Sequence, residues 1–201
     1  MTITITGTND QPIATGTYTH TVTDTAALDT FSTLTGTLAA TDVDTGDSLV
    51  WSGSATGSYG ALTVNANGSY SYAVNAAAVN ALQVGLSTSE SFMVTVTDSQ
   101  GATDTRTITI NVTAANDAPI ATGTYTHTVT DTAALDTFSA LTGTLAATDV
   151  DTGDSLTWSG SQSGTYGALT VNANGTYSYV VNAAAVNALQ VAKPVGLLTA
   201  H

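Results

Sequence analysis

Short clusters of aspartate and asparagine are the residues of this chain that could do chemistry. Asn9-Asp10 returns as Asn116-Asp117, and Asp42-x-Asp44-x-x-Asp47 returns as Asp149-x-Asp151-x-x-Asp154. A further aspartate, Asp98, begins the turn Asp-Ser-Gln-Gly. Aspartates two apart on an extended loop present their oxygens alike, and Ca²⁺ takes about six to eight oxygen ligands. The clusters therefore predict calcium binding, with plain Asx-Gly turns as the alternative.

The charge balance also favours a cation as the ligand. Asp and Glu number 15 against two basic residues, Arg106 and Lys193, so the formal net charge is -13. Nucleic acids and anionic membranes are bound through Lys and Arg, so we expect neither as a partner. No stretch approaches the roughly 18 apolar residues of a membrane helix. The chain has no cysteine, which excludes disulfides and thiolate metal sites.

The clusters recur because most of the chain is a tandem repeat. Residues 9–84 return as residues 116–191 at an offset of 107, with eight differences in 76 positions and no gap. This unit exceeds the roughly 20–50 residues of a solenoid repeat and matches a whole domain. We expect four segments: a last-strand remnant of a preceding repeat (1–8), a complete repeat (9–115), a second repeat lacking its last two strands (116–191) and a non-repeat tail (192–201).

Period-two alternation of apolar and polar residues predicts the strands that hold these loops. One hairpin is expected over 91–113 and another over 60–73, across Asn67-Gly68. Other strands are expected at 49–52 and within 16–24 and 34–41, and one short helix at 75–82. About seven strands in this length predict an all-β fold of tandem antiparallel β-sandwich modules, truncated in the second copy, with a barrel as the main alternative.

The truncated second copy would leave apolar strand faces uncovered. Its counterparts of residues 92–113 are missing, so two core strands are gone. We expect this copy to be less stable, or to borrow a strand from the tail 192–201 or from Thr2–Thr6 of another molecule.

Several motifs in fixed order resemble known repeats. Asp98 to Ala102, Thr107 to Thr113 and Asn116 to Pro119 resemble the last hairpin and linker of cadherin-like modules. The motifs closest to the VCBS repeat of large bacterial surface and RTX-type adhesins are Val22 to Ala26, Leu34 to Leu38, Asp42 to Asp47, Tyr59 to Val64 and Asn75 to Leu82.

The resemblance implies a calcium-stiffened, extracellular β-sandwich that is exported by type I secretion and acts in cell adhesion or biofilm formation. Its partners would be neighbouring repeats of the same long chain. Carried over by motif, the cadherin-like pattern puts Ca²⁺ ligands at Asn9, Asp10, Asp42, Asp44 and Asp98 for one junction. For the next junction it gives Asn116, Asp117, Asp149 and Asp151. The acidic Glu motifs of a preceding cadherin module have no clear match, since Glu90 is the only glutamate.

Two other functions compete with this reading. An aspartic protease would use one Asp-Thr-Gly per lobe, at Asp44 and Asp151, but Asp47 and Asp154 add charge where one shared proton is required. The three histidines have no nucleophile beside them, so we expect His20 and His127 on strand surfaces and no catalysis. A polysaccharide-binding module is the main alternative to a spacer. It would need exposed aromatic side chains at Trp51, Tyr59, Tyr70 and Tyr72.

Overall fold

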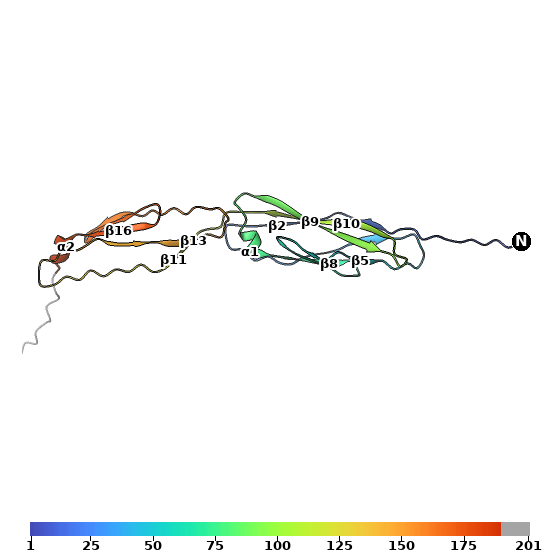
Figure 1. Cartoon of the computed structure of the whole chain (residues 1–201), viewed down its shortest axis with the longest axis horizontal. Helices are drawn as coiled ribbons and strands as arrows, with labels where there is room; N and C mark the ends of the chain where they lie inside the picture. Colours follow the sequence, from blue (N-terminus) through green and yellow to red (C-terminus); the bar gives the residue numbers. More distant parts are fainter. Residues whose placement is uncertain (190–201) are drawn as a thin grey trace, which may run out of the picture. The chain divides into compact units, whose positions relative to one another are not determined.

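A computed structural model describes residues 1–189, which fall into two compact units. The first unit comprises Met1–Ala118 with Val150–Asp154, and the second comprises Pro119–Asp149 with Ser155–His201 as far as it is described. Each unit consists of β-strands and one five-residue helix (Figure 1). The predicted all-β modules with one short helix each are confirmed. Because the strands form open sheets, the barrel alternative is wrong.

Two four-stranded sheets make up most of the first unit. The first has the order β2-β10-β9-β5, formed by Tyr18–Thr23, Thr103–Thr113, Ser87–Thr97 and Val50–Ser52. The second has the order β3-β8-β7-β6, formed by Leu34–Thr37, Ser69–Val74, Gly60–Val64 and Ala55–Thr56. A two-stranded ribbon pairs β1 (Ile13–Thr15) with β4 (Ala39–Thr41). Helix α1 (Ala76–Asn80) begins after Asn75, whose side chain accepts the Ala78 N–H.

The β9–β10 hairpin supplies the largest part of the core. Each strand has eleven residues, and alternate side chains of both strands are buried between the sheets. These buried residues are Phe92, Val94, Val96, Ile108, Ile110 and Val112. The hairpin predicted over 91–113 is therefore present, and its first strand begins earlier, at Ser87.

One strand pair of the first unit is parallel. Strand β10 runs alongside β2 from Ile108 opposite Tyr18 to Thr113 opposite Thr23, whereas its pairing with β9 is antiparallel. This pair is an exception within the predicted antiparallel sandwich. Strands β2 and β10 therefore run in the same direction.

The aromatic residues considered for sugar binding belong to the core. Trp51 and Tyr70 are each 5% exposed and Tyr72 is fully buried, while Tyr59 packs partly buried against the same cluster. His20 is also not a bare surface residue, because its Nε2 lies 2.9 Å from the Tyr70 hydroxyl. The first unit thus presents none of these aromatic rings as a platform.

The second unit contains one sheet and one ribbon within its described residues. The sheet has the order β12-β16-β15-β14, formed by Leu141–Thr144, Thr176–Val181, Gly167–Val171 and Gln162–Gly164. The ribbon pairs β11 (Ile120–Thr122) with β13 (Ala146–Thr148), and α2 spans Ala183–Asn187. Residues 125–130 and 157–159 form no strand, although they correspond to β2 and β5. In the first unit those two strands pair only with β10 and β9, which have no counterpart in the described second unit.

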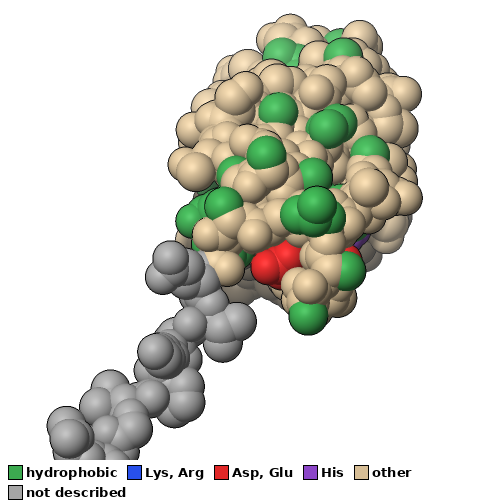
Figure 2. Space-filling model, turned by 90° about the vertical axis from the view of Figure 1, so that its left-hand side faces the viewer, with side chains coloured by type: hydrophobic (Ala, Val, Ile, Leu, Met, Phe, Trp, Pro, Cys, Tyr) green, Lys and Arg blue, Asp and Glu red, His purple; other side chains and the backbone are tan. Residues whose placement is uncertain are grey.

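Residues 1–12 form no helix or strand. Met1, Ile3 and Ile5 are exposed, the two isoleucines by 71% and 90%. Within residues 1–189 neither helix has the length or the apolar character to cross a bilayer. On the face shown in Figure 2, apolar side chains lie scattered among polar ones, and acidic side chains are visible but no Lys or Arg side chain is.

Candidate metal centre

Three aspartates gather on the loop between β4 and β5. One carboxylate oxygen from each of Asp42, Asp44 and Asp47 lies within 4.8 Å of the others. The loop folds back on itself because the Asp44 N–H donates to Asp42 Oδ1 at 2.9 Å and the Asp47 N–H donates to the Asp44 carbonyl at 3.3 Å. Gly46 has φ +88°, a left-handed conformation that glycine adopts without steric cost. These contacts within the loop bring its three carboxylates together.

Two other segments meet this loop at the same end of the first unit. The Asp10 N–H donates to Asp44 Oδ2 at 2.8 Å, and the Asn9 amide donates to Asp98 Oδ2 at 2.9 Å. The Ser99 hydroxyl donates to Asp47 Oδ1, which ties the β9–β10 turn to the β4–β5 loop. The structure thus connects the residues predicted for this junction into one network. We call Asn9, Asp10, Asp42, Asp44, Asp47 and Asp98 the first aspartate cluster.

The first aspartate cluster is negatively charged. The Asn9 amide, together with the N–H groups of Ala102, Gln100 and Gly101, holds the pKa of Asp98 below its ordinary value. Asp98 therefore stays ionised at neutral pH although it is only 6% exposed. Within residues 1–189 the one ion pair joins Arg106 to Asp104 at 3.6 Å, so no described basic side chain pairs with this cluster.

The donor set of the first aspartate cluster fits a hard cation. The side-chain atoms available as metal ligands are oxygens. The Asn9 amide nitrogen is not among them, because it donates a hydrogen bond to Asp98. Asp42 Oδ2 is buried and has no hydrogen-bond partner among the described residues. A buried carboxylate oxygen without a partner is costly, and a bound cation would remove that cost.

The second repeat reproduces the central contact of the cluster. The Asp117 N–H donates to Asp151 Oδ2 at 2.7 Å, which repeats the contact from Asp10 to Asp44 at an offset of 107. Asp117 is 1% exposed and Asp151 is 5% exposed, so this copy is more deeply buried than the first. Oxygens of Asp149, Asp151 and Asp154 again lie within 4.8 Å of one another. We call Asp117, Asp149, Asp151 and Asp154 the second aspartate cluster.

The loop that carries Asp151 is held by the first unit. The Thr152 N–H and hydroxyl both donate to the Ala81 carbonyl, at 3.3 Å and 2.6 Å. Ala81 directly follows α1, and these bonds explain why Val150–Asp154 clusters with the first unit. Asn116 differs from Asn9, because its amide donates to the Asp117 carbonyl at 2.6 Å. The structure therefore unites Asp117 and Asp151 directly.

Asp24 is an acidic residue beside the linker that the sequence analysis did not select. It directly follows β2 and is 4% exposed, and its Oδ2 accepts the Ala115 N–H at 3.1 Å. Burial raises the pKa of Asp24 above its ordinary value, against the lowering effect of the Ala115 N–H. Its Oδ1 is buried without a partner among the described residues. The sequence signal for it is an aspartate at the end of a predicted strand that recurs at the repeat offset as Asp131.

Glu90 has a structural role instead. Its carboxylate accepts hydrogen bonds from the hydroxyl of the fully buried Tyr72 and from the Tyr59 N–H, the latter at 3.1 Å. Glu90 therefore lies beside Tyr59 and Tyr72, which agrees with the absence from the sequence of the acidic Glu motifs of a cadherin module.

The model of the bacterial cadherin-like domain matches residues 9–114 and again residues 116–195. No curated protein is significantly similar to the chain. Among solved structures, the chain is similar to extracellular cadherin domains 1–4 of protocadherin gamma B7, with 15% identity, coverage of 85% of this chain and 41% of that chain, and a TM-score of 0.42.

Two further structures are similar at the same level. The structure of PcdhgB3 EC1-4 has 15% identity, 85% coverage of this chain, 40% coverage of that chain and a TM-score of 0.46. Human CDH23 EC21-23 has 17% identity, coverage of 86% and 54% respectively, and a TM-score of 0.42. The chain thus spans about half the length of these structures or less. Because the domain model matches both repeats, the chain belongs to the bacterial cadherin-like domain family.

Proposed function

We propose that the chain is a non-catalytic spacer segment of a bacterial surface adhesin, whose repeats are stiffened by calcium at their junctions. The observation that carries this proposal is the repeated contact between a linker aspartate and a loop aspartate, from Asp10 to Asp44 and from Asp117 to Asp151. In both repeats the accepting aspartate, Asp44 or Asp151, belongs to a group of three whose carboxylate oxygens lie within 4.8 Å of one another. Cadherin-like domains are typically non-catalytic adhesion modules of extracellular chains, which agrees with this role.

The mechanism is electrostatic and local. Clustered carboxylates repel one another in the absence of a cation, and this repulsion favours a linker that moves away from the loop. Calcium at these positions would supply positive charge shared between linker oxygens and loop oxygens. At an ion concentration tenfold above a Kd of about 10⁻⁴–10⁻³ M, each site would contribute about 1.4 kcal/mol to folding. That is modest for one site and appreciable across an array of repeats.

The wider setting belongs to the same proposal. The partners would be neighbouring repeats of one long chain, secreted or displayed on the cell surface. Action in adhesion or biofilm formation and export by type I secretion follow from the resemblance to RTX-type adhesins. The polysaccharide alternative has no support, because Trp51, Tyr70 and Tyr72 are core residues.

Calorimetric titration of Ca²⁺ into the EDTA-treated chain tests the proposal. We expect saturable binding below a few millimolar and a raised melting temperature. Asp44→Asn should abolish the first class of sites and leave the second, while Asp151→Asn should do the reverse. The control is Asp104→Asn, since Asp104 belongs to neither cluster and is tied to Arg106 and to the Ala14 N–H. Equal calcium binding by all four proteins, or none by any, would refute the assignment.

A further inference from the structure

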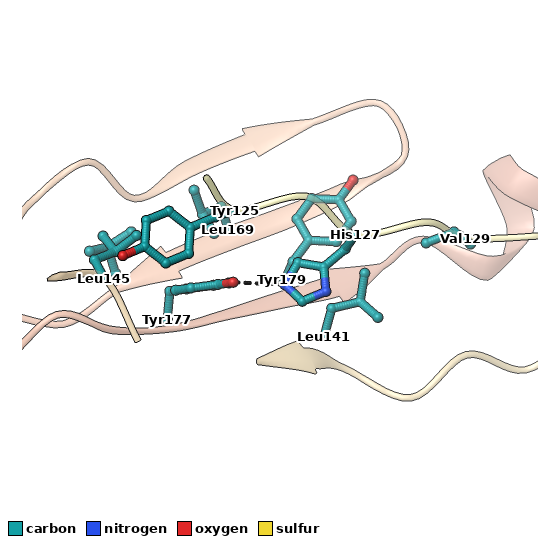
Figure 3. A pocket seen from close by; sticks show the side chains of 9 residues that line it. Tyr125, His127, Val129, Leu141, Leu145, Leu169, Tyr177 and Tyr179 are labelled. Atoms are coloured by element: carbon teal, nitrogen blue, oxygen red, sulfur yellow. Dashed lines mark hydrogen bonds between the residues drawn. The ribbon is translucent and has the colours of Figure 1, made fainter. Parts of the chain in front are cut away.

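An apolar groove runs along the second unit. Its volume is about 500 Å³, and its lining includes Tyr125, Val129, Leu169, Tyr177 and Tyr179 (Figure 3). The equivalent positions of Val129, Leu169 and Tyr179 in the first unit are Val22, Leu62 and Tyr72, which are 3%, 2% and 0% exposed. The same residues that form a closed core in one repeat thus line an open groove in the other.

The first unit shows what covers this surface. Strand β10 lies parallel to β2, with Ile108 opposite Tyr18 and Thr113 opposite Thr23. Its Ile108, Ile110 and Val112 fill the core and are at most 1% exposed. In the second unit, residues 125–130 have the same sequence as β2, Tyr-Thr-His-Thr-Val-Thr, and form no strand. A strand like the end of β10 is therefore the occupant that this groove fits.

The chain carries a second version of that strand at residues 1–6. At the repeat offset of 107, Met-Thr-Ile-Thr-Ile-Thr stands in the place of Ile108–Thr113, Ile-Thr-Ile-Asn-Val-Thr. Every other residue is apolar in both versions, so one face of either strand can fill a core. Residues 1–6 are exposed and form no strand, and their backbone groups are free to pair with an unpaired strand.

We propose that residues 1–6 of one molecule add as a parallel strand to residues 125–130 of a second molecule. Met1, Ile3 and Ile5 then occupy the groove as Ile108, Ile110 and Val112 occupy the core of the first unit. The register follows from β2 and β10, with Met1 opposite Tyr125 and Thr6 opposite Thr130. The contact joins two different surfaces, so copies of the chain associate head to tail into open chains.

A polar contact beside the groove points to the same occupant. In the first unit the Asp24 N–H donates to the Thr113 carbonyl at 2.9 Å, and Asp24 Oδ2 accepts the Ala115 N–H at 3.1 Å. Asp131 is the equivalent of Asp24, and the Oδ1 atoms of both aspartates are buried without a hydrogen-bond partner within residues 1–189. In the proposed register, Thr6 and Thr8 of the arriving molecule take the places of Thr113 and Ala115, so they present the same carbonyl and N–H to Asp131.

The test is self-association of the full chain, measured by analytical ultracentrifugation over a range of concentrations. We expect association that rises with concentration and is lost in Ile3→Asp/Ile5→Asp, with Kd raised by about tenfold or more because the groove cannot solvate a carboxylate. Thr4→Asp is the control, since Thr4 lies on the opposite face of the same strand, and its Kd should change by less than about threefold. Residues 1–6 make no strand contacts within the described chain, so these variants leave folding intact.

Disulfide trapping tests the register independently, because the chain has no cysteine. Asn111 lies opposite Thr21, so a Thr4→Cys molecule should cross-link to a Thr128→Cys molecule and not to a Thr132→Cys molecule. A monomer at all concentrations would overturn the proposal, as would association that survives Ile3→Asp/Ile5→Asp. The first result would indicate that another segment, such as the tail 192–201 outside the described residues, covers the groove.

Discussion

Glu90 offers the sharpest test of how the first unit is held together. Its carboxylate accepts from the hydroxyl of Tyr72, which is fully buried, and from the Tyr59 N–H. A hydrogen bond to a charged group contributes about 1.5–3 kcal/mol, and a buried donor left without a partner costs about 1–3 kcal/mol. Glu90→Ala removes the acceptor and leaves the Tyr72 hydroxyl buried, so we expect a loss of about 2–3 kcal/mol.

Tyr72→Phe removes the donor instead and should cost less, about 1 kcal/mol, because Glu90 keeps the Tyr59 N–H. The double variant should cost about 1–2 kcal/mol less than the sum of the single variants. For a domain of this size, the loss in Glu90→Ala corresponds to a fall in Tm of about 10–20 °C. The second repeat offers a natural control: within residues 1–189 the Tyr179 hydroxyl has no carboxylate partner, so Tyr179→Phe should change stability by less than about 0.5 kcal/mol.

Urea unfolding in a Trp158→Phe background measures these costs, because the fluorescence then comes from Trp51, which is 5% exposed in the first unit. Additive costs in Glu90→Ala and Tyr72→Phe would show that the two side chains do not interact. A large cost in Tyr179→Phe would show that the hydroxyl matters without Glu90. Either result would refute this account of Glu90.

Three further predictions concern the pH dependence and the cores. Burial raises the pKa of Asp24, so its stabilising contribution belongs to the protonated form and is lost as pH rises through that pKa. We therefore expect Asp24→Asn to raise the Tm in EDTA at pH 7 and to change the Tm little at acid pH. Hydrogen bonding from Asn9 lowers the pKa of Asp98, so the contribution of Asp98 to stability is present at neutral pH and is lost as pH falls through the lowered pKa. In urea unfolding, Asp98→Asn should be less stable than the unchanged chain at pH 7 and equally stable at the acid limit. Leu62→Ala should cost about 2–5 kcal/mol in calorimetry, because Leu62 is 2% exposed, while the half-buried Leu169→Ala should cost clearly less, and equal costs would contradict the open groove.

The local sequence pattern predicts most of the strands of the first repeat. It does not predict which of them are missing from the second repeat. The β9–β10 hairpin and the β7–β8 hairpin follow from alternation and turn residues, and both are present. Tyr-Thr-His-Thr-Val-Thr, however, is strand β2 at residues 18–23 and no strand at residues 125–130. The difference lies in the neighbour, because β2 pairs only with β10. Strand formation depends on a partner that no local window contains.

The candidate site could be predicted in part for a similar reason. Asp42, Asp44 and Asp98 stand out by residue type and spacing, and the structure places each of them at one end of the first unit. Asp24 stands alone in sequence, and only the parallel β2–β10 pair brings it beside Ala115 and the linker. The role of Glu90 could not be predicted from the spacing of residues in the sequence either, because it depends on a contact with Tyr72 across the sandwich.

The central claim is that calcium restricts motion between repeats, and a distance distribution between spin labels tests it most directly. Labels at Thr105 and Thr170 lie in different units, on exposed positions of β10 and β15, and a Thr35–Thr105 pair within the first unit is the control. The account predicts a broad Thr105–Thr170 distribution in EDTA that narrows on saturation with Ca²⁺ and stays broad in Asp44→Asn/Asp151→Asn, while the control pair is unchanged. A Thr105–Thr170 distribution of the same width with and without Ca²⁺ would contradict the claim that these clusters stiffen the array.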